Sequence, residues 1–566
     1  MTDTAEPVAA LRLEVVPEVG EHPIDPELRA TVAAHPDIRA QYPSADLWLV
    51  GRDILDKEEG PDARFRAVLH DLAGSEVVEV DGFLGYPDLS VTPTGRHRLP
   101  NEEEHAWARE VLRVDPELAR RLDEGELSTY RPLPPLASRA TPDGSVDRAV
   151  TVGLREVTPK GVRHRVVAVR AADGEVLDDV PGLPEGDREF GVPDGPECGP
   201  GSGDSQARVR VWRGEELLWD LLVVRPSASS GVNGSGVELR TVDYRRVRVL
   251  HRAHLPVLNV AYEGPKRPSE RGAGPTHRLW LNEEACFEAE GDEPVAGFRV
   301  CQQPPTTILE RGEGGGAFRG VALFVDGDEL LIVSQLQAGW HRYVNEWRLA
   351  SDGTIRPRLG FSAVTNPCTG EPHIHHTYWR LDFDVVASDS NQVQEFNDPT
   401  LPGQLSPWHT IRYEVRRQRD PERQRRWRVR SIRMPHGYTL VPGAGDGSAD
   451  AYGVGDVWIV AYHGDEIDDD QGCTRDPADS RAHLDRFVSG EMLERQDVVL
   501  WYSAHVRQDA DAAPEGSGGR VGPDLEPYNW RPPSERGPYI PIEPPPQDDP
   551  DDDDPGPPPS EPAATE

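Results

Sequence analysis

Most of this 566-residue chain consists of short runs in which β-branched and aromatic residues alternate with polar ones. The runs extend from about residue 207 to residue 506, as in ARVRVWR (207–213) and HTYWRLDFDVV (376–386), and Gly, Pro and Asp separate them. Alternation with a period of two is typical of strands that bury one face. About 300 residues of this pattern predict one large antiparallel β-sandwich.

Two smaller modules precede this region, each with a helical pattern followed by strand-like runs. In the second module, Asn101 is a candidate helix N-cap because Glu104 follows three residues later. The predicted fold is therefore mainly β, a large antiparallel β-sandwich preceded by two small α+β domains. Its predicted parts are a loose leader (1–20), two small α+β domains (21–95 and 96–190), a Gly- and Pro-rich linker (191–206), the sandwich (207–537) and a disordered, acidic, Pro-rich tail (538–566).

The composition disfavours several classes of partner. The chain has 99 acidic and 61 basic residues and a formal net charge of -38, and only three of its basic residues are Lys. Nucleic acid and anionic membranes are therefore not expected as partners. No apolar run approaches the ~18 residues of a membrane span, and the N-terminus lacks the pattern of a signal peptide, so the protein is predicted to be cytoplasmic. Five Cys without C-x-x-C spacing indicate neither a disulfide framework nor a zinc ribbon.

A His-x-His pair stands immediately before one of the strand-like runs. His373 and His375 are two residues apart on a predicted strand, so both side chains face the same side and can bind one metal ion, whereas His376 points away. Taken alone, the pair has a competing interpretation as ordinary surface or core histidines.

Several segments, in order, resemble the catalytic domain of the copper amine oxidases. The copper-site signature of that family is His-x-His followed by Arg-x-Asp-x-Asp, and it is matched by His373, His375, Arg380, Asp382 and Asp384. Further matches are VRVLHRAHLPVLNVAYE (247–263), YVNEWRLASDGTI (343–355), GYTLVPG (437–443), DVWIVAYHGDE (456–466), DVVLWYSAHV (497–506) and LEPYNW (525–530). The resemblance implies a copper-containing oxidoreductase that forms a homodimer, with the two small domains in the place of the pair that precedes the family's catalytic domain.

The chain departs from this family at the redox cofactor. Family members make topaquinone from a tyrosine, and alignment on Gly339, Tyr343 and Trp347 places His341 at that position. An imidazole cannot be oxidised to a quinone, and Tyr343 fits a second aromatic position of the family instead. The resemblance therefore indicates a divergent member that lacks topaquinone.

The position of the family's catalytic base is also substituted. The best match is Asn282, and an amide does not act as a general base at neutral pH. Glu283 or Glu284 is the alternative base, and the competing interpretation is two solvated acids on a turn.

Two metal sites are implied by the resemblance. For copper, His505 is expected to join His373 and His375 as the third ligand if the segment after Asp497 carries a three-residue deletion relative to the family. A gapless alignment gives Gln508 instead. His341 is expected to be a fourth ligand or a close partner. For a structural cation, calcium or a similar divalent ion, the implied ligands are the side chains or carbonyls of Asp382, Phe383, Asp384, Asp497 and Val498. The competing interpretation of these acids is that they simply face water.

Two functions remain open. The first is a copper-dependent oxidoreductase that works without topaquinone, and the second is a non-catalytic dimeric scaffold or binding protein with residual metal affinity. Convergent imidazoles favour the first, because a scaffold does not need them. Conventional primary-amine oxidation is disfavoured by the substitution at His341, and the residues do not indicate a substrate.

Overall fold

The computed structural model describes the following residues: 10–18, 30–32, 34–42, 47–57, 62–71, 76–94, 97–132, 136–140, 146–158, 161–177, 203–262, 276–312, 315–339, 341–363, 372–447, 456–472, 481–508 and 520–530. All elements named below belong to the compact unit Met1–Tyr528.

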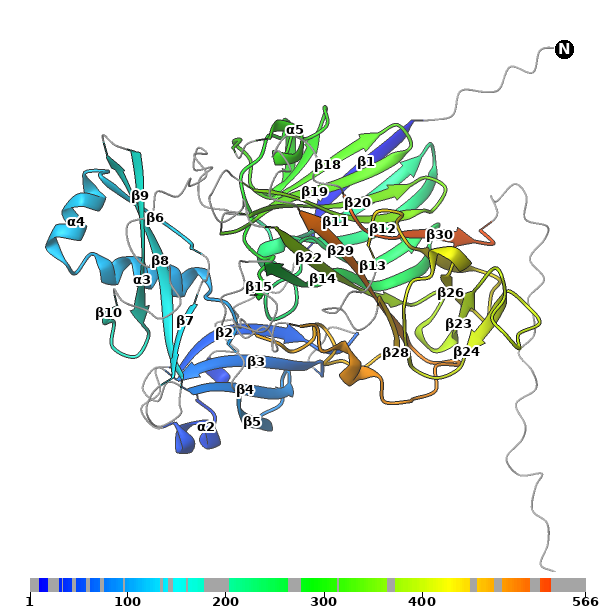
Figure 1. Cartoon of the computed structure of the whole chain (residues 1–566), viewed down its shortest axis with the longest axis horizontal. Coiled ribbons are helices and arrows are strands. Elements are labelled where there is room, and N and C mark those ends of the chain that lie inside the picture. Colours follow the sequence, from blue (N-terminus) through cyan, green and yellow to red (C-terminus); the bar gives the residue numbers. More distant parts are fainter. Residues whose placement is uncertain are drawn as a thin grey trace, which may run out of the picture. The chain divides into compact units, whose positions relative to one another are not determined.

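The first large sheet contains ten antiparallel strands. Its strand order is β1-β11-β12-β13-β14-β22-β29-β28-β25, and β15 pairs with β14 away from this path. The strands are β1 (Leu11–Pro17), β11 (Gln206–Arg213), β12 (Glu216–Val224), β13 (Glu238–Tyr244), β14 (Val247–Tyr262), β15 (Thr276–Leu279), β22 (His373–Phe383), β25 (Val415–Arg417), β28 (Val457–Ala461) and β29 (Val498–Gln508). Strands β22 and β29 are far apart in sequence and lie side by side near the middle of this sheet (Figure 1).

The second large sheet contains eleven strands in the order β16-β17-β18-β19-β20-β21-β30-β27-β26-β23-β24. Only the pairing of β17 with β18 is parallel among its described strands. The strands are β16 (Gly291–Val295), β17 (Phe298–Cys301), β18 (Val321–Asp326), β19 (Glu329–Ala338), β20 (His341–Ala350), β21 (Ile355–Ala363), β23 (Asn391–Phe396), β24 (Trp408–Ile411), β26 (Arg426–Ser431), β27 (Gly437–Val441) and β30 (Asp524–Tyr528), with the short helix α5 (Ile308–Arg311) beside them.

The two large sheets face each other and bury a core rich in tryptophan. Trp219 on β12 donates its indole N–H to the carbonyl of Ala350 in the second sheet, and Trp347 on β20 donates to the carbonyl of Val237 next to β13, both at 2.9 Å. Both indoles are fully buried. These contacts place β20 opposite the first sheet, and the histidine group described below depends on this arrangement.

Each of the two N-terminal modules contains one smaller sheet together with helices. The first has the strands β2 (Leu47–Ile54), β3 (Arg64–Asp71), β4 (Glu76–Phe83) and β5 (Leu89–Thr94), with helix α2 (Pro36–Gln41). The second has β6 (Leu127–Tyr130), β7 (Leu136–Ala140), β8 (Val146–Thr158), β9 (Gly161–Arg170) and β10 (Val176–Leu177), with helices α3 (Glu102–Leu112) and α4 (Pro116–Asp123). The mainly β fold class with a large antiparallel sandwich is thus confirmed.

Local signals explain how the second module begins. Asn101 caps α3, since its side chain accepts from the Glu104 backbone N–H while the Glu104 carboxylate accepts from the Asn101 N–H. This reciprocal capping box satisfies two N–H groups that a helix start leaves unpaired. The helix then buries Ala108 and Leu112 against β8 and β9.

Some expectations need correction. Leu11–Pro17 was expected in a loose leader but forms β1 at the edge of the first large sheet, paired with β11, because its alternating apolar residues suit a strand. Cys286 is disulfide-bonded, which the sparse cysteines did not indicate, and Cys301 is free and buried. The expected disordered tail and residues 191–202 of the expected linker lie outside the described residues. In the described part, no helix is both long and apolar enough to cross a membrane.

Candidate metal centre

Three buried histidines from the two facing sheets converge inside the sandwich. His373 and His375 lie on β22 of the first sheet, and His341 begins β20 of the second. All three side chains are 0% exposed, and one ring nitrogen of each lies within 4.8 Å of one ring nitrogen of the others. The period-two spacing on β22 brings His373 and His375 to one face, as predicted, and the packing of the sheets supplies His341.

The rings of this group are arranged at steep angles to one another. The ring centroids of His341 lie 5.5 Å from those of His373 and His375, with interplanar angles of 64° and 90°. The His373 and His375 centroids are 4.8 Å apart at 60°. Rings turned in this way bring nitrogen atoms together without stacking their faces, so the three nitrogens can face a common point.

His375 is held in a fixed orientation. Its Nδ1 lies 3.2 Å from the hydroxyl of Tyr343, and the Phe361 ring stacks on it at a centroid distance of 3.8 Å. Its Nε2 is buried and has no hydrogen-bond partner among the described residues. Burial first, and then the neighbouring His373 and His341, hold the pKa of His375 well below its usual range, so the imidazole is neutral and can donate a nitrogen lone pair to a metal ion.

Two phenols lie against the histidines. The Tyr262 hydroxyl is 2.9 Å from His341 Nε2, and the Tyr262 ring packs near His373 with centroids 5.0 Å apart. Burial, with a smaller contribution from Tyr262, raises the pKa of Tyr343 well above its usual range, so this phenol keeps its proton. Tyr343 lies on the same face of β20 as His341, and its hydroxyl contacts His375 Nδ1.

His505 lies on the other face of the first sheet, apart from the His341, His373 and His375 group. It pairs across the strands with His376, and residues directly opposite each other in an antiparallel pair project to the same face. His505 Nδ1 is 2.7 Å from His376 Nδ1, and its Nε2 lies 3.2 Å from the Ser503 hydroxyl and 3.4 Å from an Asp456 oxygen. The structure therefore does not bring His505 to His373 and His375, as the sequence predicted, and the third imidazole of the group is His341.

Gln508, the residue of the gapless alignment, lies on the face of the histidine group. It pairs directly with His373 in the register of β22 and β29. Its side-chain oxygen is buried without a hydrogen-bond partner among the described residues. The gapless alignment thus gives a residue on the same face as the histidine group, and this residue carries an amide.

The residues at the family's base position are engaged elsewhere. Asn282 is half-buried, and its Cα and Cβ lie close against Gly234. Glu283 accepts from the Trp280 indole at 3.1 Å, and Glu284 forms a buried two-point ion pair with Arg225. The two acids are thus paired within the protein, which differs from the interpretation as solvated acids on a turn.

The three aspartates of the implied structural cation site also come together. Asp382 and Asp384 lie at the end of β22, and Asp497 precedes β29. Their carboxylate oxygens lie within 4.8 Å of one another. The Nζ atom of Lys57, from the segment after β2, contacts all three. Sequence reasoning missed Lys57, and the only signal for it was the rarity of Lys in this chain.

Comparison with known proteins supports the fold. No protein-family model and no curated protein matches the chain. The chain is similar to the crystal structure of Pichia pastoris lysyl oxidase, with 11% sequence identity, a TM-score of 0.50, and coverage of 93% of this chain and 92% of that chain. It is also similar to a copper-containing benzylamine oxidase from Hansenula polymorpha, with 11% identity, a TM-score of 0.49, and coverage of 82% and 88%. The chain has the copper amine oxidase fold.

Proposed function

We propose that His341, His373 and His375 bind one transition-metal ion, and that the protein is a copper-dependent oxidoreductase that works without topaquinone. The observation that carries this proposal is the convergence of three fully buried imidazoles from two facing sheets. Buried polar atoms are normally paired with other groups of the protein, and His375 Nε2 is buried in this group without a hydrogen-bond partner among the described residues, which a bound metal ion would account for.

The donor set suits copper. Neutral imidazole nitrogens bind copper, zinc, iron and nickel, and copper(II) has the highest affinity in the usual order of divalent ions. When bound, copper supplies one-electron redox chemistry. The residues of the chain orient the ligands: Tyr343 and Phe361 fix the His375 ring, and Tyr262 fixes His341. The burial of all three histidines also keeps the centre away from bulk water.

Topaquinone does not fit this site. The aligned precursor position is His341, which cannot form a quinone, and Tyr343 uses its hydroxyl to contact His375 Nδ1. Conventional amine oxidation through that cofactor is therefore not proposed. The retained histidines favour a metal-dependent enzyme over a pure scaffold, and the test below separates the two.

The test is elemental analysis of the purified protein together with electron paramagnetic resonance. We expect one copper ion per chain, a copper(II) spectrum with nitrogen hyperfine splitting, and no redox-cycling stain for quinone after incubation of metal-free protein with copper and air. A quinone stain that disappears in Tyr343→Phe would show that Tyr343 is the precursor. Protein that binds no transition metal when copper or zinc is supplied would support the scaffold instead.

Tyr343→Phe is expected to weaken metal binding without abolishing it. The substitution keeps the ring and removes the hydroxyl that lies 3.2 Å from His375 Nδ1. Loss of such an outer partner of a metal-binding histidine typically lowers affinity by about 10- to 100-fold. Competition with a chelator of known affinity measures the change. Phe361→Leu is the comparison variant, because it changes a neighbour of His375 but keeps the hydrogen bond between Tyr343 and His375. Equal copper affinity in wild type and Tyr343→Phe would contradict the role of the hydroxyl.

A further inference from the structure

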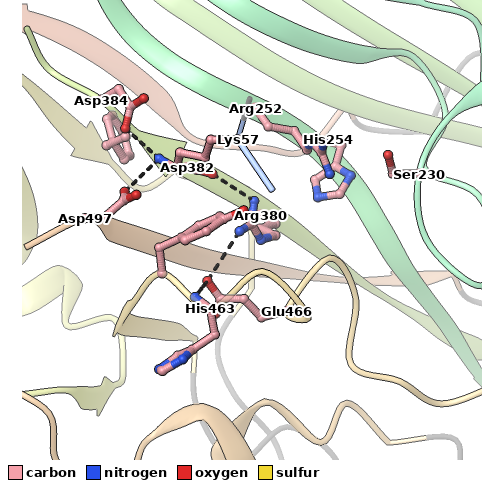
Figure 2. Close-up of polar contacts among 12 residues, drawn as sticks. Lys57, Ser230, Arg252, His254, Arg380, Asp382, Asp384, His463, Glu466 and Asp497 are labelled. Atoms are coloured by element: carbon pink, nitrogen blue, oxygen red, sulfur yellow. Dashed lines mark hydrogen bonds and ion pairs between the residues drawn. The ribbon is translucent and has the colours of Figure 1, made fainter. Parts of the chain in front are cut away.

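Lys57 is surrounded by three carboxylates of the sandwich. Its Nζ lies 2.7 Å from Asp382 Oδ1, 2.6 Å from Asp384 Oδ1 and 2.7 Å from Asp497 Oδ1 (Figure 2). The ammonium also lies over the Tyr462 ring, 4.7 Å from its centroid. An ammonium has three N–H donors, and here each has a carboxylate acceptor. The cation is therefore fully coordinated by the protein itself.

This geometry leaves no place for a divalent ion on the same oxygens. Calcium binds oxygen at about 2.3–2.6 Å, so an ion that shared these three atoms would overlap Nζ. The distances observed are those of charge-assisted hydrogen bonds from an ammonium. The three aspartates predicted to bind calcium are thus brought together as predicted, but the charge that they surround is a side chain.

One of the two backbone ligands expected for calcium has a protein partner as well. The Phe383 carbonyl accepts a hydrogen bond from Asn391 Nδ2 at 3.1 Å. Val498 is paired on both sides, with Phe383 on β22 and with Ala461 on β28. The three aspartates and the Phe383 carbonyl are therefore engaged in contacts within the chain, and Val498 lies inside the sheet between β22 and β28.

Charge balance explains why a cation is needed here. The pKa of Asp497 is raised to about 7 by burial first and then by nearby Asp382 and Asp384, against the opposing effect of Lys57. Burial by itself would lower the pKa of Lys57, but Asp382, Asp384 and Asp497 outweigh it and the pKa is raised above its usual value. The side chain of Lys57 is only 16% exposed, so these interactions are weakly screened by solvent.

Lys57 comes from a different module than its partners. Lys57 follows strand β2 of the first small sheet. Two residues before it, the Leu55 carbonyl accepts a hydrogen bond from the hydroxyl of Tyr462, the residue that follows β28. Asp53 on β2 likewise accepts from the Gly231 N–H at 3.1 Å. The segment around Lys57 is thus attached to the sandwich at three points, the third being the contact of Lys57 with the aspartate cluster. On the sandwich side, Arg380 of β22 also lies 3.4 Å from Asp382 Oδ2 (Figure 2).

We propose that Lys57 is the resident cation of the Asp382, Asp384 and Asp497 cluster, that it takes the place of a divalent ion there, and that it fastens the first small sheet to the sandwich. The wild-type protein then needs no calcium at this position. Removal of the ammonium leaves three clustered carboxylates, which form a latent site for a hard divalent cation.

The decisive variant is Lys57→Ala, examined with calcium alone as the probe. Both proteins are first freed of transition metal, so that the chelator can act only on calcium. In this wild type, we expect the melting temperature to be the same with excess chelator and with millimolar calcium. In Lys57→Ala, we expect a lower melting temperature in chelator, a rise when calcium is added, and one more bound calcium ion per chain by equilibrium dialysis. A Lys57→Ala protein that takes up no additional calcium, or a wild type that loses stability in chelator, would overturn the proposal.

The double variant Lys57→Ala/Asp384→Asn locates the effect. Glu414, His463 and Glu491 also lie close enough to hold an ion, so calcium uptake must be assigned to one cluster. We expect the double variant to lose the calcium response of Lys57→Ala, because one of its three carboxylates is gone. A response that persists in the double variant would place the calcium elsewhere and overturn the proposal.

A measurement on wild type keeps the proposal testable if Lys57→Ala does not fold. An ammonium with three carboxylate partners is a poor nucleophile, since it must first lose its proton. Reductive methylation of the native protein, followed by mass spectrometry, should leave Lys57 unmodified while the α-amino group reacts. Complete modification of Lys57 in the folded protein would overturn the proposal.

Discussion

His375→Ala is expected to abolish binding of the transition-metal ion that we propose for this site. The His375 imidazole is fully buried, is held by Tyr343 and Phe361, and has an Nε2 atom without a hydrogen-bond partner among the described residues. Loss of a partner outside the ligand shell already costs about 10- to 100-fold in affinity, so loss of one of three ligands is expected to cost more than ~100-fold. Metal content after dialysis, measured by elemental analysis, should fall from one ion per chain to a trace.

His505→Gln is the matched control for this substitution. His505 is a buried histidine on the strand next to β22, but it projects to the opposite face, where it contacts His376. We expect it to keep the metal, whereas His341→Ala should lose the metal as His375→Ala does. If His505→Gln lost the ion and His341→Ala kept it, the group proposed here would be the wrong one.

Arg148→Ala is expected to destabilise the second small domain by about 3–5 kcal/mol, because breaking one side of a buried ion pair leaves the other charge unpaired. The side chains of Arg148 and Glu104 are 0% and 1% exposed, and two guanidinium nitrogens contact the carboxylate at 2.7 and 2.9 Å. Arg148 also donates to the Arg98 carbonyl at 3.0 Å. The same Glu104 completes the cap of α3, so its environment also affects the start of the helix.

Urea unfolding followed by circular dichroism measures the effect of Arg148→Ala. Arg113→Ala is the control, since Arg113 pairs with Asp123 on the surface, with side chains 40% and 66% exposed, and exposed pairs contribute little. We expect a large shift of the unfolding midpoint for the buried pair and little change for the exposed one. Shifts of equal size in the two variants would show that burial does not control the stability of this pair.

Local periodicity determined several features of this protein. A period of two placed His373 and His375 on one face and His376 on the other, because successive side chains of a strand alternate. The spacing of Asn101 and Glu104 predicted the cap of α3, because both partners lie within one helical turn. The alternating runs predicted a large antiparallel sandwich. The gathering of Asp382, Asp384 and Asp497, by contrast, was implied by the family resemblance and not by periodicity.

Only the tertiary structure decided the third histidine. The face to which His505 projects depends on the register of β29 against β22, and a shift of one residue turns every side chain of a strand to the other face. The run DVVLWYSAHV allows either register by itself. His341 joins the group because β20 lies in the opposite sheet, and no local pattern specifies how two sheets pack.

The sequence alone thus determined which residue types were available for each site and which face of its own strand each one occupies. It could not determine which cation sits among Asp382, Asp384 and Asp497, because Lys57 is 325 residues away from Asp382 and belongs to another sheet. No periodic pattern of residues along the chain indicates a contact between two modules. It arises when the modules pack, and packing here brings a single ammonium within hydrogen-bond distance of three carboxylates.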